Sequence, residues 1–231
     1  MKSIFLILLV VLSLFSPSFS KAEVYSDANE ITYEKLINNL GTDHVQHFRK
    51  LFSVKKFRNV LEFGMGYGTK YFLDNCDKVT SMEFVLIPEH HKWFDICRKL
   101  YRDYPSWKIK KLETPQSLIQ ADFEARTREG HEIFSYLMDL KRIIFQNVAD
   151  NTYDLIFVDT GFHPRADIIN LLFGKTKVIV AHDTNFRYGR YGWRRIKVPS
   201  DYKEIQLIEG SGVTVWIHKS EDKLIQAVSK N

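Results

Sequence analysis

Two aspartates and two histidines follow neighbouring apolar runs of this sequence and could do chemistry. Asp159 and His163 come after one run, and His182 and Asp183 come directly after the next. Carboxylates at neighbouring strand ends can share a hard cation such as Mg²⁺ through their oxygens. Such an ion would lower the pKa of an acceptor hydroxyl and orient it for reaction. We predict Asp159 and Asp183 as catalytic residues that bind a metal ion together.

The same positions also allow chemistry without a metal. His163 or His182 could act as a general base, because imidazole titrates near neutral pH and suits proton removal. The alternative for each histidine is a polar strand-end side chain that is satisfied by the backbone. Asp159 could instead cap the loop that follows it. Of the four candidates, we favour the two aspartates.

A glycine-rich bend precedes these residues in the chain. The apolar run 60–63 contains Glu62 and ends in glycines at alternate positions, Gly64, Gly66 and Gly68. A strand, a glycine loop and a helix in succession let bare backbone approach a nucleotide-like ligand. Glycine suits such a bend because a Cβ would block either a positive φ or the ligand itself.

A further carboxylate follows at a fixed distance. The segment 78–83 reads as a second strand that ends in Glu83, about 20 residues after the first strand. In nucleotide-binding α/β folds, an acid at this place accepts hydrogen bonds from both ribose hydroxyls. We therefore predict Glu83 as the residue that binds a ribose. A solvated acid at a strand end is the alternative.

The order Glu62-x-Gly64-x-Gly66-x-Gly68, with Glu83 after the second strand, resembles the first motif of class I S-adenosylmethionine-dependent methyltransferases. The resemblance implies S-adenosyl-L-methionine as the cofactor. It implies a cofactor site made of Glu62, Gly64, Gly66, Tyr67, Gly68, Thr69, Glu83, Phe84 and Asp159. A dinucleotide fingerprint would read G-x-G-x-x-G, so the spacing speaks against an NAD-dependent dehydrogenase.

The strand-end aspartates resemble the metal-binding acids of catechol O-methyltransferase-like enzymes, in which an acid–Asn pair follows the fifth strand. Here Asp183 is followed by Thr184, and Asn185 lies one place too far along. This departure leaves Mg²⁺ dependence open. The bend, Glu83, the Lys-Trp-Phe triplet at 92–94 and the pair His182-Asp183 also resemble the glucuronoxylan O-methyltransferase family. That resemblance implies a secretory-pathway enzyme that acts on glycans.

The segment 185–195 places four arginines among four aromatic residues beside the proposed reaction centre. Arginine pairs well with carboxylates or phosphates, and aromatic faces stack on sugars or bases. We predict Arg187, Arg190 and Trp193 as substrate-binding residues for an anionic acceptor. A merely solvated charged loop is the alternative.

Alternating strand-like and helix-like segments predict the elements that must position these residues. Strands are expected at 60–63, 78–83, 107–112, 153–159, 177–181, 202–208 and 213–218. Helices are expected at 34–52 with a break at Gly41, and at 69–76, 88–104, 116–128 and 164–173. A further helix carries Ile133, Leu137, Leu140, Ile144 and Val148 on one face. The long stretch 113–150 could be a lid over the substrate or additional packing, and we favour packing for its second helix.

These elements predict an α/β fold. The expected sheet is Rossmann-like, doubly wound and mostly parallel, with helices on both faces and a terminal antiparallel hairpin through 209–212. Such an arrangement also matches the seven-stranded order of class I methyltransferases.

The N-terminus resembles a targeting signal. Lys2 precedes an apolar run over 4–15, and small residues near Ala22 offer a cleavage site. The run is shorter than the roughly 20 residues that a comfortable membrane span needs. We predict a signal peptide at 1–22, an exported protein without a stable membrane span, and one domain over 23–231; a short uncleaved anchor is the alternative.

Composition fits this interpretation. The chain has 231 residues, of which 45% are hydrophobic and 14% aromatic, enough for one domain with a substantial core. Its formal charge of +5 is mild and gives no reason to expect nucleic acid as a partner. Cys76 and Cys97 could pair in an oxidising compartment, but two buried thiols are the favoured alternative. The oligomeric state stays open.

Three functions follow from the sequence. The first is an exported methyltransferase that transfers a methyl group to oxygen of a small or glycan-like acceptor. The second is a methyltransferase-like domain that has lost transfer activity and binds a ligand or partner. The third is another nucleotide-binding α/β enzyme, such as a dehydrogenase.

Overall fold

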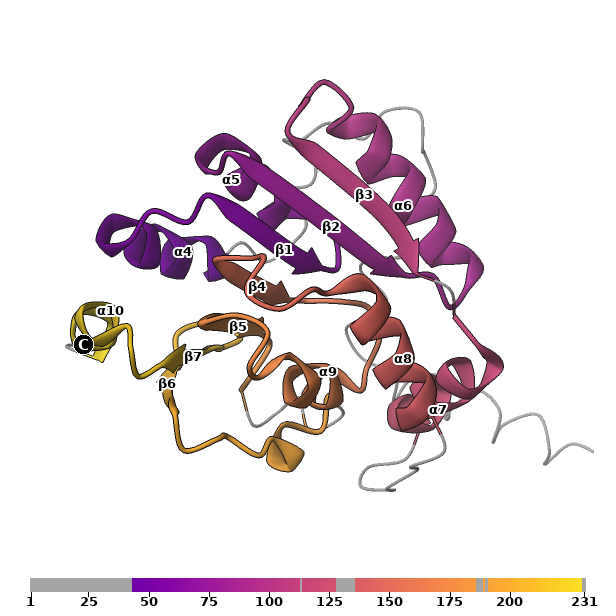
Figure 1. The fold of residues 1–231 in the computed structure, drawn as a ribbon. Coiled ribbons are helices and arrows are strands. Elements are labelled where there is room, and N and C mark those ends of the chain that lie inside the picture. Colours follow the sequence, from indigo (N-terminus) through magenta and orange to yellow (C-terminus); the bar gives the residue numbers. More distant parts are fainter. Residues whose placement is uncertain (1–42, 113, 128–135, 186–188, 190, 230–231) are drawn as a thin grey trace, which may run out of the picture.

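A computed structural model describes residues 43–112, 114–127, 136–185, 189 and 191–229 of the chain. In this part of the chain, seven strands form one sheet, which lies between two layers of helices (Figure 1). The strands are β1 (Asn59–Phe63), β2 (Lys78–Phe84), β3 (Trp107–Leu112), β4 (Leu155–Val158), β5 (Val178–His182), β6 (Tyr202–Leu207) and β7 (Val213–His218). All seven predicted strands are present, each within two residues of its expected bounds.

The strand order is β3-β2-β1-β4-β5-β7-β6. The first five strands pair in parallel, and β7 runs antiparallel to both β5 and β6. The order reverses between β1 and β4, so the loops after these strands lie together at one edge. This switch point is where open α/β sheets bind ligands. The predicted α/β class with its terminal hairpin is confirmed.

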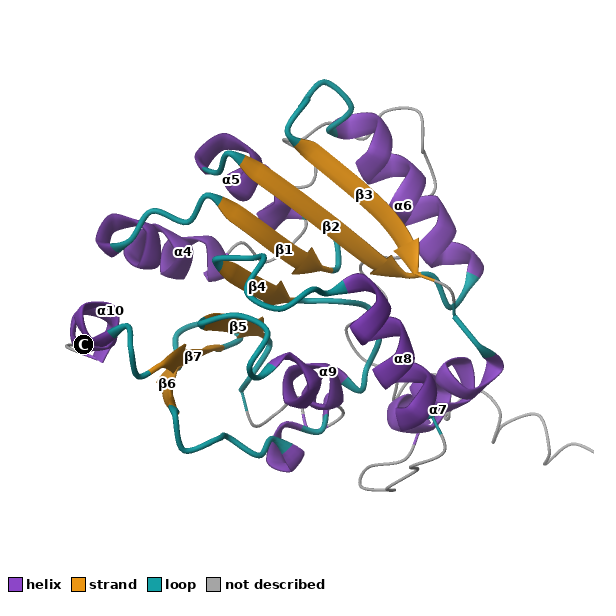
Figure 2. Cartoon of the chain, viewed as in Figure 1, coloured by secondary structure: helices purple, strands orange, loops and turns teal. Residues whose placement is uncertain are grey.

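Helices cover both faces of the sheet, which appears as the orange layer in Figure 2. They are α4 (Asp43–Val54), α5 (Tyr67–Asn75), α6 (Pro88–Leu100), α7 (Gln116–Thr127), α8 (Leu137–Asn147), α9 (Arg165–Leu172) and α10 (Asp222–Ser229), with a short 3₁₀ helix η4 (Trp193–Arg195). We did not anticipate α10 or η4 from the sequence. The signal peptide 1–22 and the first half of the helix expected at 34–52 lie outside the described residues.

Two apolar clusters fill the space between the sheet and the helix layers. One contains side chains of α7, α8 and α9 on one face, and the other contains side chains of α4, α5, α6 and α10 on the opposite face. Alternate residues of β1 supply both clusters, because successive side chains of a strand point to opposite faces. Leu61 and Phe63 enter the first cluster, and Val60 enters the second.

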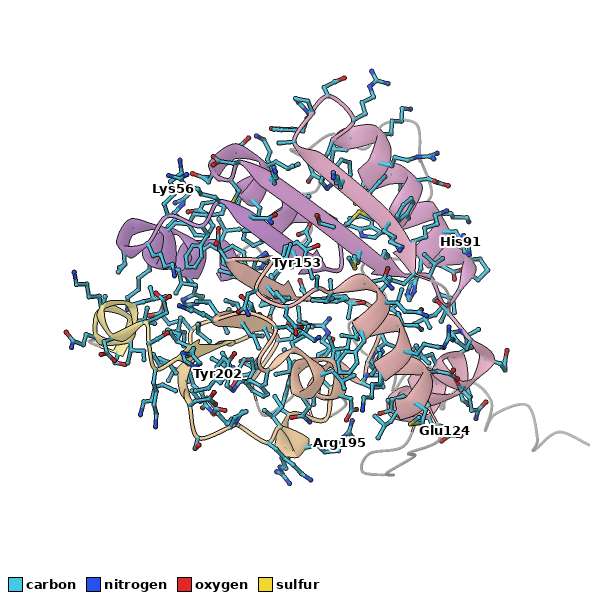
Figure 3. All side chains as sticks on the ribbon, in the orientation of Figure 1. Lys56, His91, Glu124, Tyr153, Arg195 and Tyr202 are labelled. Carbon is cyan, nitrogen blue, oxygen red and sulfur yellow. The ribbon has the colours of Figure 1, made fainter. Side chains whose placement is uncertain are left out.

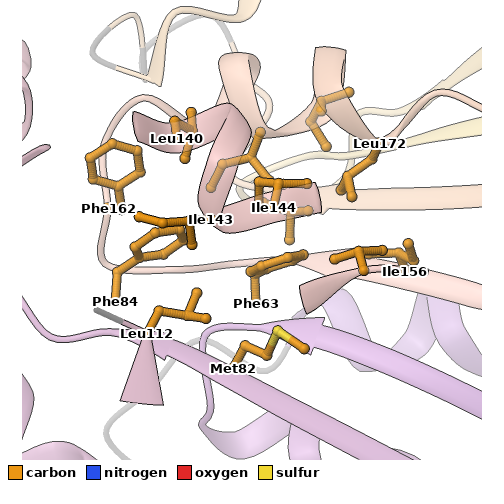
Figure 4. Packing of buried hydrophobic residues seen from close by; sticks show 14 of the residues in the cluster. Phe63, Met82, Phe84, Leu112, Leu140, Ile143, Ile144, Ile156, Phe162 and Leu172 are labelled. Carbon is orange, nitrogen blue, oxygen red and sulfur yellow. The ribbon is translucent and has the colours of Figure 1, made fainter. Parts of the chain in front are cut away.

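Helix α8 packs on the sheet. Its Leu140, Ile143 and Ile144 are buried, and Figure 4 shows them above Phe63 and Ile156. This placement agrees with the packing that we favoured over a lid for this helix. Within the described part of the chain, no helix has the length and apolar character needed to cross a membrane.

Candidate functional site

The bend after β1 requires glycine at its first position. Gly64 has a φ of +94°, and a Cβ there would lie 2.3 Å from the carbonyl oxygen of Asp159. Its N–H donates to the Met82 carbonyl at 2.9 Å. The bend is therefore pressed between the carboxyl ends of β2 and β4, where a side chain would not fit.

Glu83 touches this bend directly. Its Oε2 accepts a hydrogen bond from the Met65 N–H at 2.9 Å, and the side chain is buried. Two side chains hold the bend from outside: the indole N–H of Trp93, in α6, donates to the Met65 carbonyl at 2.6 Å, and the hydroxyl of Tyr101, directly after α6, donates to the Gly66 carbonyl at 2.9 Å. A carboxylate on the neighbouring strand thus meets a bend whose carbonyls are fixed before any ligand arrives.

The other two glycines differ in their surroundings. Gly66 is extended, and a Cβ there would meet only Trp93, in ordinary contact at 3.5 Å. A Cβ at Gly68 would lie 2.9 Å from His44 Nε2, so this glycine allows α5 to pack against α4. The Thr69 hydroxyl accepts the Gly66 N–H at 2.9 Å, at the start of the helix. Of Tyr67, only the backbone is described.

Glu62 lies beneath the bend and is buried. It accepts a short hydrogen bond from Ser81, and the Ser81 hydroxyl in turn accepts the Trp107 indole N–H at 2.7 Å. Burial raises the pKa of Glu62 to about 8, against the opposing effect of the Ser81 and Thr69 hydrogen bonds. Its carboxyl group therefore carries a proton at neutral pH and belongs to an internal network.

Phe84, the last residue of β2, lies in the core. Its side chain is fully buried and stacks on Phe162 with ring centroids 5.0 Å apart. Figure 4 labels both rings. Because the ring is enclosed by the core under α8, its side chain has no face for a cofactor.

The aspartates that follow β4 and β5 come together around an arginine. Arg165 Nη1 lies 2.9 Å from Asp159 Oδ1 and 3.2 Å from Asp183 Oδ2. The guanidinium packs over the Tyr191 ring at 4.0 Å and is buried. Burial alone would lower the pKa of Arg165, but Tyr191 and the two aspartates raise it above its ordinary value. A charged guanidinium therefore lies between the two carboxylates.

This guanidinium bears on the predicted metal site. Asp159, His182 and Asp183 offer ligand atoms within 4.8 Å of one another. However, two unit charges 4 Å apart interact by about 4 kcal/mol at an effective dielectric constant of about 20, and a divalent ion would feel about twice that repulsion from Arg165. The nearest nitrogen, His182 Nδ1, is also a poor ligand for Mg²⁺, which prefers oxygen. The residues present do not fit a shared Mg²⁺, and the metal prediction for Asp159 and Asp183 is not supported.

Both candidate histidines are engaged with protein groups. His182 Nδ1 lies 3.3 Å from Asp159 Oδ2, and its Nε2 lies 2.6 Å from the Ser211 hydroxyl. The His163 backbone N–H donates to Asp122 Oδ1 at 2.7 Å, and His163 Nδ1 lies 3.0 Å from the same oxygen. Both side chains are buried, whereas the Asp159 and Asp183 side chains keep exposed fractions of 23% and 19%. The aspartates are therefore the accessible members of the predicted catalytic set.

Asp183 is held in an unusual conformation. Its φ is +61°, in the left-handed region, and the Trp193 indole N–H donates to its carbonyl at 2.8 Å. The Trp193 indole N–H thus anchors the loop after β5 and is not available to a bound substrate. Asn185 turns away and donates to the Gly210 carbonyl at 3.1 Å. Arg187 and Arg190 lie outside the described residues.

Sequence reasoning missed three residues of this site: Arg165, Tyr191 and Asp122. A signal existed for Arg165, because it is a charged residue at the first position of the helix after β4 and follows Asp159 closely. Tyr191 was visible only as one aromatic residue of a charged loop. Nothing in the sequence pointed to Asp122, which reaches His163 from a helix 41 positions away.

Comparison of the sequence with models of protein families gives no match, and comparison with curated proteins gives none either. Solved structures do match. A candidate caffeoyl-CoA O-methyltransferase from Staphylococcus aureus superposes with a TM-score of 0.51 at 15% identity, over 87% of this chain and 100% of the other. An O-methyltransferase from Bacillus cereus in complex with SAH superposes with a TM-score of 0.51 at 14% identity, over 89% of this chain and 92% of the other. This chain therefore has the fold of class I S-adenosylmethionine-dependent methyltransferases.

Proposed function

We propose that the protein is an S-adenosylmethionine-dependent methyltransferase that methylates an oxygen of a small or glycan-like acceptor. One observation carries the proposal: the Glu83 carboxylate lies at the Met65 N–H, at the switch point of a sheet with the class I strand order. An acid on the second strand beside a glycine bend after the first is the arrangement that binds the ribose of a nucleoside.

The residues at the bend fit such a cofactor. Glu83 would accept hydrogen bonds from the ribose, and the backbone of Gly64 to Gly66 would lie against the amino acid part. Gly66 is only half-buried, and a Cβ there would meet only Trp93 in ordinary contact, so a ligand could approach its backbone. When bound, the cofactor supplies a methyl group on a positively charged sulfur. The negative charge of neighbouring carboxylates such as Glu83 would stabilise the positively charged sulfur electrostatically.

The protein's own part in the reaction is to hold the acceptor and take its proton. Asp183 is partly exposed after β5, and its Oδ2 is fixed by Arg165 and by the Tyr191 hydroxyl at 3.4 Å. We assign Asp183 as the group that accepts the acceptor's proton, with Asp159 beside it. Holding reactants in line contributes roughly 7–11 kcal/mol to lowering a barrier, so methyl transfer needs no covalent catalysis by the protein.

The class of acceptor rests on the loop after β5. Arg187 and Arg190 supply the positive charge that favours an anionic acceptor such as a uronic acid or a phosphorylated compound. The aromatic residue between them, Tyr188, would stack on a sugar ring. A glycan acceptor also agrees with export.

Titration calorimetry of the purified protein with S-adenosylmethionine and with NAD tests the cofactor. We expect saturable binding of S-adenosylmethionine and no binding of NAD. Tight binding of NAD alone would instead establish a dinucleotide enzyme.

Replacing Asp183 by Ala tests the catalytic assignment. We expect Asp183→Ala to lower the turnover number at least 100-fold while the affinity for S-adenosylmethionine stays within about threefold, because general-base groups contribute roughly 10²–10⁴ to rates. Turnover is measured as S-adenosylhomocysteine release with carboxylate- and hydroxyl-bearing sugars. An unchanged turnover number would remove Asp183 from the mechanism.

A methyltransferase-like binding module is the second candidate function. The observation that favours it is the buried Arg165, which neutralises part of the charge that a catalytic carboxylate pair would carry. Saturable cofactor binding without turnover on any tested oxygen acceptor would support this function over the enzyme.

We further propose that residues 1–22 direct export. The support is the sequence pattern of a charged residue, an apolar run and small residues at its end. Fusion of residues 1–22 to a reporter enzyme should place the reporter outside the cytosol. A fusion that stays in the cytosol would contradict export and leave the enzyme proposal unaffected.

A further inference from the structure

We infer that Arg165 serves as a built-in counter-cation, which fixes Asp159 and Asp183 as a divalent ion otherwise would and makes this strand-end site independent of metal. The inference goes beyond the proposed activity. It rests on the contacts of the described residues and holds whether or not methyl transfer is the reaction.

The guanidinium is held from several directions. Nη1 donates to Asp159 Oδ1 at 2.9 Å, to Asp183 Oδ2 at 3.2 Å and to the His182 carbonyl at 3.3 Å. Nε donates to the Thr160 carbonyl at 2.8 Å. These partners belong to the ends of both β4 and β5, so a single side chain joins the two loops.

Burial keeps this cation in place. The Arg165 side chain is 4% exposed, and the face of Tyr191 covers its central carbon at 4.0 Å. Arg165 also belongs to the first turn of α9, whose side chains are anchored in the core. An entering metal ion would have to displace this buried charged group, or share the site with it against electrostatic repulsion.

The same geometry implies a latent metal site. Without the guanidinium, two carboxylates and the His182 imidazole would remain, with ligand atoms within 4.8 Å of one another. Carboxylate oxygens with an imidazole nitrogen suit Mn²⁺. Removal of the positive charge should therefore allow a metal ion to bind where wild type excludes it.

The experiment compares Mn²⁺ binding by wild type, Arg165→Gln and Arg165→Lys, using the full chain. Loss of the free Mn²⁺ signal in electron paramagnetic resonance measures binding, and the melting temperature with and without MnCl₂ gives a second measurement. We expect neither wild type nor Arg165→Lys to bind. We expect Arg165→Gln to bind one ion, with a melting temperature raised by roughly 5–10 °C at a hundredfold excess over Kd.

Two controls locate the effect. Arg195 pairs with Asp167 at 2.6 Å at the periphery of the molecule (Figure 3). The control variant Arg195→Gln also removes an arginine from a carboxylate, and it should gain no bound ion. Arg165→Gln combined with Asp183→Asn should lose the gained ion. One Mn²⁺ bound by wild type and lost in Asp183→Asn would overturn the inference, and this result does not depend on whether Arg165→Gln folds. A folded Arg165→Gln variant that binds no ion would overturn it as well.

Discussion

The carboxyl groups around the bend differ in their access to water, and this difference assigns their roles. Glu62 and Glu83 are buried, with hydrogen-bond partners in the neighbouring strand and bend. Asp159 and Asp183 remain partly exposed at the strand ends. A proton acceptor for a substrate must be reachable, so the two aspartates suit that task and the two glutamates suit support and cofactor binding.

Glu83→Gln should weaken S-adenosylmethionine binding by roughly 10- to 100-fold. The reason is that hydrogen bonds to a charged acceptor contribute roughly 1.5–3 kcal/mol, and glutamine lacks the charge. Titration calorimetry measures the change. Glu89→Gln, an exposed acid on α6, is the matched control and should bind as wild type does. Equal affinity in both variants would contradict the ribose assignment.

Glu62→Gln should change how stability depends on pH. The pKa of Glu62 is about 8 when folded, against an ordinary 4.5, so between these pH values the folded state keeps a proton that the unfolded state has lost. Wild-type stability should therefore fall as pH rises, by roughly 1.4 kcal/mol per pH unit from this group alone. Glutamine does not titrate, so the variant should gain stability relative to wild type from pH 5 to pH 8.

Urea unfolding at pH 5, 6, 7 and 8 measures the pH effect of Glu62→Gln. Glu209→Gln, which replaces an exposed acid, should follow the wild-type curve. Parallel curves for wild type and Glu62→Gln would show that the buried carboxyl group is ionised in the folded protein.

Single residues could be predicted where a short motif fixes them and not where the fold brings distant segments together. The placement of Glu83 beside the glycine bend follows from strand spacing alone, because parallel strands end at the same edge. The Arg165 contacts could not be foreseen, since they need the register between β4 and β5 and the turn that opens α9. The Phe84 side chain lies in the core, because it directly follows Glu83 and successive side chains of a strand point to opposite faces.

At the scale of elements, the bend after β1 depends on a close approach between two strand ends. Gly64→Ala should destabilise the protein by more than 3 kcal/mol, because a Cβ would overlap the Asp159 backbone and because φ is positive there. Gly174→Ala is the control: its φ is +81°, but a Cβ there would meet nothing within 4 Å. It should cost only the backbone strain, about 1–2 kcal/mol. Chemical unfolding of both variants checks the difference.

The periodicity of apolar residues predicted which segments are helices and which are strands, and the turn residues predicted where they begin and end. Helix α6 begins at Pro88, as expected for proline in a first turn. The four-residue strand β4 is shorter than the predicted range 153–159 and coincides with the apolar run Leu155–Val158; before it, the Asp154 carboxylate accepts the N–H groups of Arg58 and Asn59. The C-terminal α10 was missed because its eight residues follow a strand closely with no strong start signal.

At the scale of the whole molecule, the two cysteines are thiols on one side of the sheet. They form no disulfide with each other. Burial raises the pKa of the Cys76 thiol to about 12, and Cys97 is fully buried. The core therefore holds the fold without a covalent crosslink, even though the N-terminal pattern indicates export.

The two thiols should react with Ellman's reagent only after unfolding. At pH 8 the native protein should show little reaction, because a raised pKa leaves almost no thiolate at Cys76 and no solvent reaches Cys97. Two equivalents should react in guanidinium chloride. A reducing agent should leave the melting temperature unchanged. A lowered melting temperature on reduction would indicate a disulfide that this structure does not contain.

The hairpin of β6 and β7 meets the loop after β5 through its own turn. Thr184 and Asn185 donate their N–H groups to the carbonyls of Gly212 and Ser211, and the Ser211 hydroxyl contacts His182. The length of this turn therefore sets where Asp183 stands. Insertions or deletions at 209–212 should therefore move Asp183 and change which acceptor is preferred. They would leave the proposed cofactor site after β1 and β2 unchanged.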